Sequence, residues 1–105
     1  MPVTVVATLS VKPESLDAAR DILTKTIAAV HEEPGCDLYS LHEADGGTFI
    51  FVEQWADGDA LAAHGQAPAV TQMFAEVGEH LAGAPDIKVA QAVVAGNPAK
   101  GSLRP

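Results

Sequence analysis

The segment of residues 33–64 constrains the fold of this chain more than any other. It holds two strand-like stretches, residues 36–44 and 48–55, which are separated only by Asp45-Gly46-Gly47. Glycines supply the positive φ angles that a tight hairpin requires, so we expect these two stretches to pair as antiparallel strands. A chain with this hairpin near its centre needs further strands and helices to cover the apolar residues that the hairpin carries.

The segments around the hairpin predict the other elements of the sheet and the first helix. Residues 4–11 and 87–95 are rich in β-branched residues, which favour strands. Apolar residues recur at helical spacing over residues 16–32, where Ser15 can cap the start of the helix. The Pro34-Gly35 pair ends this helix.

A second helical region follows the hairpin and is interrupted once. Asp57 can cap a short helix that ends at His64, and Gly65 then breaks it. Pro68 can start a longer helix that runs to Leu81. We therefore expect a bent second helical element.

The order β-α-β-β-α-β predicts an α+β, ferredoxin-like fold, in which two helices cover one face of a four-stranded antiparallel sheet. We assign residues 1–95 to one domain and residues 96–105 to a C-terminal tail of turn composition. The last two strands carry apolar side chains on both faces, although a sheet covered on one side alternates apolar with polar residues. We expect a face-to-face homodimer, with a small, poorly patterned sheet as the alternative.

Composition excludes several classes of partner. The 105 residues include fourteen carboxylates against six Lys and Arg, a net charge of −8, which disfavours nucleic acid and anionic membrane surfaces. No apolar run approaches the roughly 20 residues that cross a bilayer. The N-terminus has no basic region or cleavage site of a signal peptide, so we expect a cytoplasmic protein. The single Cys36 has no second cysteine for a disulfide or a thiolate metal site.

Three short motifs carry a family resemblance through their order and spacing. They are Pro34-Gly35-Cys36 with Tyr39, the strand end Glu53-Gln54-Trp55, and His64 on the next helix. With these motifs, residues 3–95 resemble the antibiotic biosynthesis monooxygenase domain, a branch of the dimeric α/β-barrel superfamily. The resemblance implies a protomer that dimerises through its sheet, with a pocket between sheet and helices. It also implies oxidation of phenols, quinols or polyketide anthrones by molecular oxygen, without metal, haem or flavin.

Oxygenation without a cofactor requires a small aromatic substrate that donates electrons to oxygen after it loses a proton. The protein must then supply a base, a donor for the oxyanion and apolar walls. His64 is the candidate base, because histidine titrates near neutral pH. Tyr39 and Trp55 are candidate donors to the developing phenolate. The expected substrate-binding residues are Phe51, Met73, Phe74 and Leu81.

Each polar candidate also has a structural interpretation. His64 can be a helix-terminal histidine favoured by the helix dipole. Trp55 can be an anchor that closes the end of the sheet, and Tyr39 can lie outside the pocket. A buried carboxylate at Glu53 needs a partner, for which we expect Lys88 or a basic residue of a partner subunit.

Two other functions remain as alternatives. A non-catalytic dimeric module that binds a small hydrophobic metabolite is favoured by the shortage of convergent polar groups. An isomerase of the same fold needs basic groups for an anionic substrate, and only Arg20 and Lys88 are candidates. No metal site is expected, because the histidines lack the spacing of a ligand set.

Overall fold

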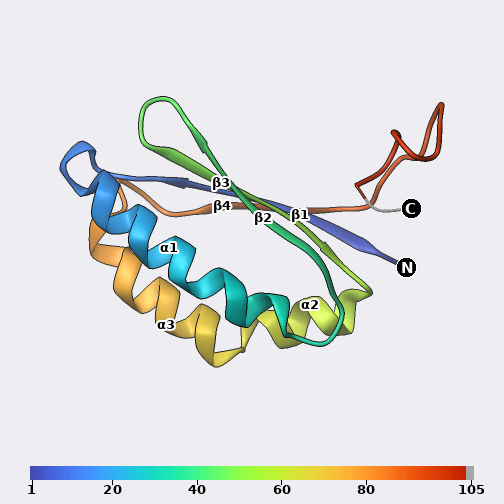
Figure 1. Cartoon of the computed structure of the whole chain (residues 1–105), viewed down its shortest axis with the longest axis horizontal. Coiled ribbons are helices and arrows are strands. Elements are labelled where there is room, and N and C mark those ends of the chain that lie inside the picture. Colours follow the sequence, from blue (N-terminus) through green and yellow to red (C-terminus); the bar gives the residue numbers. More distant parts are fainter. Residues whose placement is uncertain (104–105) are drawn as a thin grey trace.

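Four antiparallel strands form the single sheet of the computed structural model, which describes residues 1–103 (Figure 1). The strands are β1 (Val3–Ser10), β2 (Cys36–Ala44), β3 (Thr48–Trp55) and β4 (Asp86–Ala90), in the spatial order β2-β3-β1-β4. The strands pair antiparallel throughout. This is the ferredoxin-like arrangement that the sequence predicted.

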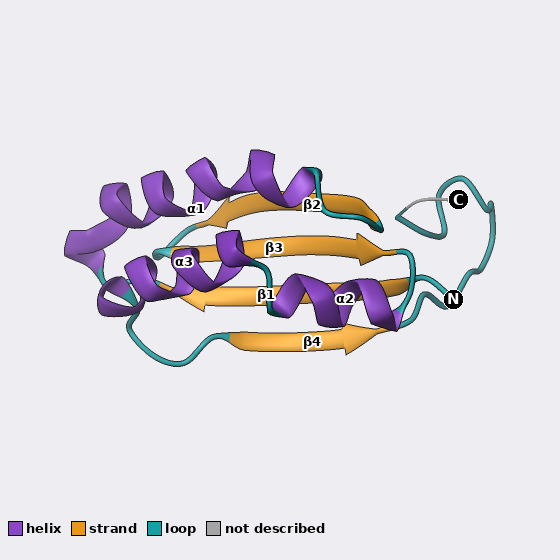
Figure 2. Ribbon diagram, turned by 90° about the horizontal axis from the view of Figure 1, so that it is seen from below, coloured by secondary structure: helices purple, strands orange, loops and turns teal. Residues whose placement is uncertain are grey.

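The helices lie on one face of the sheet, as Figures 1 and 2 show. They are α1 (Leu16–His31), α2 (Gly58–Gly65) and α3 (Pro68–Val77), with short 3₁₀ helices η1 (Pro13–Ser15) and η2 (Gly78–His80). In Figure 2, α1 runs along the β2 side, while α3 and α2 follow one another along the middle of the sheet. None of the helices in residues 1–103 has the length and apolar character needed to cross a membrane.

Local sequence fixes the β2–β3 hairpin and the start of α2. Both strands have the predicted bounds, and Gly46 and Gly47 turn the chain with φ of 82° and 78°. A side chain at either position would be strained there, which is why the turn uses glycines. The Asp57 side chain accepts a hydrogen bond from the Ala60 backbone N–H at 2.8 Å, which confirms the predicted cap.

Two details of the helices differ from the predictions. Ser15 does not cap α1 with its side chain; its hydroxyl lies 2.9 Å from Nδ1 of His80 instead. The helix predicted to reach Leu81 ends as α3 at Val77 and continues only as η2.

The last strand is shorter than predicted and ends at Ala90. Ala90 pairs with Thr4, at the N-terminal end of β1, so few β1 residues remain beyond it. Pro2 also lacks the N–H that a longer ladder would need. The length of β4 is therefore limited by its partner strand.

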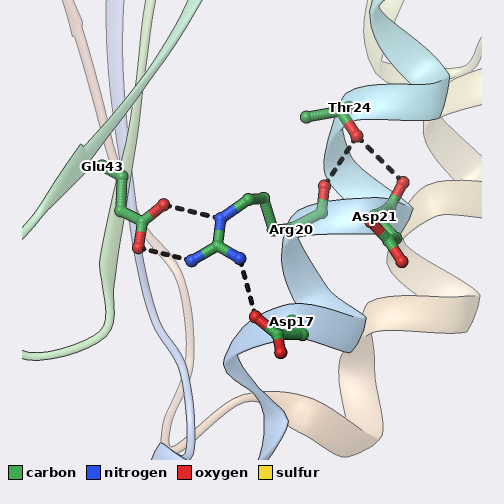
Figure 3. Close-up of polar contacts among 5 residues, drawn as sticks. All are labelled: Asp17, Arg20, Asp21, Thr24 and Glu43. Carbon is green, nitrogen blue, oxygen red and sulfur yellow. Dashed lines mark hydrogen bonds and ion pairs between the residues drawn. The ribbon is translucent and has the colours of Figure 1, made fainter.

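The core fills the space between the sheet and the helices. The largest fully buried side chains come from both layers: Leu9, Leu23, Val30, Phe49, Phe51, Trp55 and Val77. On the solvent side, α1 is also joined to β2 by an ion pair in which Arg20 Nε donates to Glu43 Oε1 at 2.8 Å (Figure 3). Arg20 contacts Asp17 one helical turn earlier as well.

Candidate functional site

A cavity of about 390 Å³ lies between the sheet and the helices α2 and α3. Small-molecule sites in proteins typically enclose about 300–1,000 Å³, so this space suits a small organic ligand. Its lining is largely apolar, and the titratable side chains among it are those of Tyr39, Glu53 and His64. Ile87 and Val89 of β4 also line the cavity, and these two residues are 53% and 61% exposed.

Most of the predicted site residues meet at this cavity. Tyr39, Phe51, His64, Met73 and Phe74 all line it. Tyr39 stacks on Phe51 with ring centroids 4.7 Å apart, and its ring edge meets His64 at 5.5 Å. The packing of these rings gives the cavity an aromatic wall on the β2–β3 side.

Trp55 and Leu81 lie elsewhere, which corrects the expected site. Trp55 is completely buried at the end of β3, and its indole Nε1 donates to Glu53 Oε1 at 2.9 Å. Its N–H is therefore used inside the protein and is not directed at a ligand. Leu81 pairs with Val11 beside the core and does not line the cavity.

His64 occupies the last turn of α2, with its side chain only 9% exposed. Its Nδ1 lies 3.0 Å from Glu33 Oε1, which is a hydrogen-bond distance. Its Nε2 lies 3.8 Å from Glu53 Oε1, which is too long for a hydrogen bond. The imidazole ring also packs against Trp55, with centroids 4.3 Å apart. His64 is thus held between two carboxylates and an indole.

The turn between α1 and β2 brings Glu33 to His64. Gly35 in this turn has φ of +83°, and a Cβ at that position would lie 2.5 Å from Cβ of Ala60 on α2. The Gly35 carbonyl accepts a hydrogen bond from the Ala56 N–H at 2.8 Å. Only a glycine allows the turn to approach α2 this closely. The prediction of the site missed Glu33, although the Pro34-Gly35 turn beside it was a usable signal.

The prediction that Lys88 pairs with Glu53 is wrong. Glu53 pairs in register with Val5, whose side chain is buried on the helix-covered face. Lys88 pairs with Val6, one position along, so its side chain lies on the opposite face of the sheet. Lys88 instead contacts Asp86 at 2.9 Å. The Trp55 indole is the hydrogen-bond partner of Glu53.

The hydrogen bond to Glu33 assigns the protonation of His64. A carboxylate oxygen only accepts hydrogen bonds, so Nδ1 carries the hydrogen when the imidazole is neutral. Nε2 then keeps its lone pair beside Glu53, and the imidazole is part of the cavity lining. This is the arrangement that a base acting on a ligand in the cavity requires.

Burial shifts the other two titratable groups of the cavity toward their neutral forms. Loss of water raises the pKa of Glu53, although the Trp55 hydrogen bond and His64 oppose this and the charge of Glu33 adds to it. Burial likewise raises the pKa of Tyr39 far above its ordinary range, and Glu53 and Glu33 add to the effect. Tyr39 therefore keeps its proton and can act only as a hydrogen-bond donor to a developing oxyanion.

The described residues that line the cavity include neither a set of metal ligands nor a Lys or Arg side chain. Among residues 1–103, no group of three or more His, Cys, Asp or Glu side chains is arranged to hold a metal ion. None of the residues that line the cavity is Lys or Arg. The lining thus suits a neutral ligand better than a phosphorylated or carboxylated one.

Comparisons with known proteins agree on the family. The model of the family described as antibiotic biosynthesis monooxygenase matches residues 2–76. A Mycobacterium tuberculosis protein named "Putative monooxygenase Rv0793" is 36% identical over 81 residues, covering 76% of this chain and 80% of that protein. The solved structure of Rv0793 superposes with a TM-score of 0.85 at 30% identity, over 92% of this chain and all of the other.

A second solved structure gives the same result. It is that of a Caulobacter crescentus protein described as a "putative antibiotic biosynthesis monooxygenase", and it superposes with a TM-score of 0.83 at 34% identity. The match covers 88% of this chain and 90% of the other. Sequence and fold therefore agree that this chain belongs to the antibiotic biosynthesis monooxygenase family.

Proposed function

We propose that this protein is a cofactor-independent monooxygenase that oxidises a neutral, quinol-like or polyketide aromatic substrate with molecular oxygen. The observation that carries the proposal is His64, whose imidazole lines an aromatic-walled, mostly apolar cavity while Glu33 holds its Nδ1. Family membership and the name of the Mycobacterium relative support the same reaction class.

The proposed chemistry starts with a proton transfer. The substrate O–H or acidic C–H loses its proton to His64 Nε2, and the electron pair stays on the substrate, which becomes a good donor to oxygen. Tyr39 donates a hydrogen bond to the oxyanion, and the apolar walls exclude water. For an anthrone, the methylene becomes a carbonyl. One atom of O₂ enters the product, and the other leaves as water with the two methylene hydrogens.

The test is oxygen uptake with anthrone, menadiol and a small panel of phenols, comparing wild type with His64→Ala. A catalytic base contributes about 10²–10⁴-fold, so we expect the variant to lose most of the enzymatic rate. His42→Ala is the matched control, because His42 is exposed, its Nε2 lies 2.8 Å from the Ser40 hydroxyl, and it does not line the cavity. Unchanged uptake in His64→Ala would exclude the proposed role of His64. Absence of uptake above the spontaneous rate on the whole panel would contradict the substrate class.

Isotope labelling separates oxygenation from simple quinol oxidation. With ¹⁸O₂, a monooxygenase places one labelled atom in the product, whereas quinol oxidation to hydrogen peroxide places none. We expect one labelled atom in the anthraquinone that wild type forms from anthrone. Product without label would show that the enzyme is an oxidase and not a monooxygenase.

A non-catalytic module that binds a small hydrophobic metabolite is the second candidate. The observation in its favour is the small number of polar groups around a cavity whose wall is otherwise apolar. Such a module would be stabilised by ligands in a thermal-shift screen without any turnover. The isomerase alternative loses support, because Arg20 pairs with Glu43 and Lys88 with Asp86, both away from the cavity.

We further propose that two copies associate through the face of the sheet that the helices leave uncovered. Register and alternation place Val6, Ile50 and Val52 together at the middle of this face. Val6 is 36% exposed in the single chain, and Ile50 and Val52 are half-buried. Light scattering after gel filtration should give the mass of a dimer for wild type and a smaller mass for Val52→Glu. A monomeric wild type would contradict this assembly.

A further inference from the structure

His64 lies between two hollows of the molecule. On one side is the cavity, which His64 lines together with Glu53. On the other side, a surface groove of about 480 Å³ runs between the α1–β2 turn and α2, and Glu33 lines it. Since Glu33 and His64 are hydrogen-bonded, the two side chains connect the cavity to this groove.

The two carboxylates beside His64 have different environments. Glu53 is buried inside the cavity wall, and burial raises its pKa, which favours a neutral carboxyl there. Glu33 has a side chain that is 16% exposed and lies at the groove. The carboxylate charge that acts on the imidazole is thus placed on the side away from the cavity.

One oxygen of Glu33 has no partner inside the protein. Oε1 accepts from His64 Nδ1, but Oε2 is buried without a hydrogen-bond partner among the described residues. A buried carboxylate oxygen without a partner is costly, so the hydrogen bond from His64 Nδ1 to Oε1 is the contact that compensates this carboxylate. Glu33 is therefore placed to orient the imidazole, and its Oε1 lies where it can receive the Nδ1 proton.

We propose that Glu33 is the positioning residue of the site: it holds His64 as the Nδ1–H tautomer and takes that proton when Nε2 accepts one from the substrate. This inference rests on the proposed function. In the step, the substrate X–H bond breaks and the Nε2–H bond forms, while Nδ1–H breaks and a Glu33 O–H bond forms. The imidazole stays neutral, the electron pair stays on the substrate, and the negative charge moves from Glu33 to the substrate. The reverse transfer returns the proton when oxygen leaves as water.

The tautomer can be measured without any substrate. In uniformly ¹⁵N-labelled protein at neutral pH, the side-chain nitrogen shifts of His64 should report hydrogen on Nδ1 and a lone pair on Nε2. Glu33→Leu should lose this preference, and Glu32→Gln should keep it, because Glu32 is the exposed neighbour. Hydrogen on Nε2 in the wild type, or an unchanged tautomer in Glu33→Leu, would overturn the inference whether or not the protein is a monooxygenase.

Turnover then tests the proton transfer itself. Glu33→Gln keeps a hydrogen-bonding side chain but cannot take up a proton, so we expect kcat with anthrone to fall by about tenfold or more. A small carboxylate buffer such as formate should restore part of the loss in this variant and not accelerate Glu32→Gln. A merely structural role would not respond to the buffer. An unchanged kcat in Glu33→Gln would contradict the proton transfer to Glu33. An inactive wild type would instead contradict the proposed function, and the tautomer measurement alone would then decide the role of Glu33.

Discussion

Two clusters of carboxylates connect α1 and the turn after it to the rest of the molecule. They differ in how far their side chains are exposed to solvent. Around His64, Glu33 and Glu53 are mostly or fully buried. Around Arg20, whose contacts Figure 3 shows, both Asp17 and Glu43 are exposed. Burial raises the pKa of Glu53, whereas hydrogen bonding to Arg20 lowers the pKa of Glu43. The exposed cluster is an ordinary surface ion pair, while the buried cluster holds its carboxylates away from water around a histidine.

The largest effect should come from removing the indole beneath the buried cluster. Trp55→Ala leaves a large cavity and deprives Glu53 of its donor, so we expect a loss of about 3–5 kcal/mol in the free energy of unfolding. Trp55→Phe keeps most of the packing and should lose only about 1–3 kcal/mol, the cost of an unsatisfied buried acceptor. Urea denaturation followed by circular dichroism measures both, since Trp55 is the only tryptophan. Equal losses in the two variants would mean that the hydrogen bond to Glu53 is unimportant.

The next effect concerns the turn that carries Glu33. Gly35→Ala introduces a Cβ in contact with Ala60 and forces an alanine to a φ of +83°. We expect a destabilisation of about 1–3 kcal/mol, together with loss of the His64 tautomer because Glu33 moves away. Gly65→Ala is the control, since a Cβ there meets nothing within 4 Å. A Gly35→Ala protein with wild-type stability would show that the close approach is not required.

A smaller and pH-dependent effect should distinguish Glu53. The pKa of Glu53 is higher in the folded than in the unfolded protein. Its burial therefore does not lower the free energy of unfolding at a pH below the ordinary carboxyl pKa, and lowers it increasingly as the pH rises above that value. Glu53→Gln keeps an oxygen for the Trp55 N–H and removes this cost. Thermal unfolding should therefore show a gain in stability over wild type that is larger at pH 7 than at pH 4. A gain that is the same at both pH values would show that burial does not oppose its charge.

The exposed cluster should give the smallest effect, with the opposite sign. The pKa of Glu43 is lower in the folded protein, so its contribution is present above the ordinary carboxyl range and is lost as the pH falls. Glu43→Gln should lower the melting temperature slightly at pH 7 and leave it unchanged at low pH. Added salt should reduce the difference, because exposed pairs are screened. A large, salt-independent loss would contradict the contrast between the clusters.

The fold was predictable where local chemistry determines it. The hairpin bounds followed from Gly46 and Gly47, and the start of α2 followed from Asp57. The end of β4 was not predictable, because it depends on how much of β1 remains to pair with it.

The site was predictable in His64 and in its apolar part except Leu81, but not in its hydrogen bonds. Strand alternation places Phe51 and Glu53 on one face of β3, whereas the position of Tyr39 opposite Glu53 depends on the β2–β3 register. The use of the Trp55 N–H by Glu53 and the contact from Glu33 to His64 arise only when the α1–β2 turn packs against α2. Helical or strand periodicity carries no information about such contacts between distant segments.

If His64 removes a proton from an aromatic substrate inside the cavity, the deprotonated substrate should be observable when protein and substrate are mixed without oxygen. Without oxygen the reaction stops after deprotonation, so wild-type protein and anthrone should develop the absorbance of the anthrone anion at neutral pH. His64→Ala should not develop it, and His42→Ala should match the wild type. An anion that forms equally well with His64→Ala, or does not form with any of the proteins, would contradict the account.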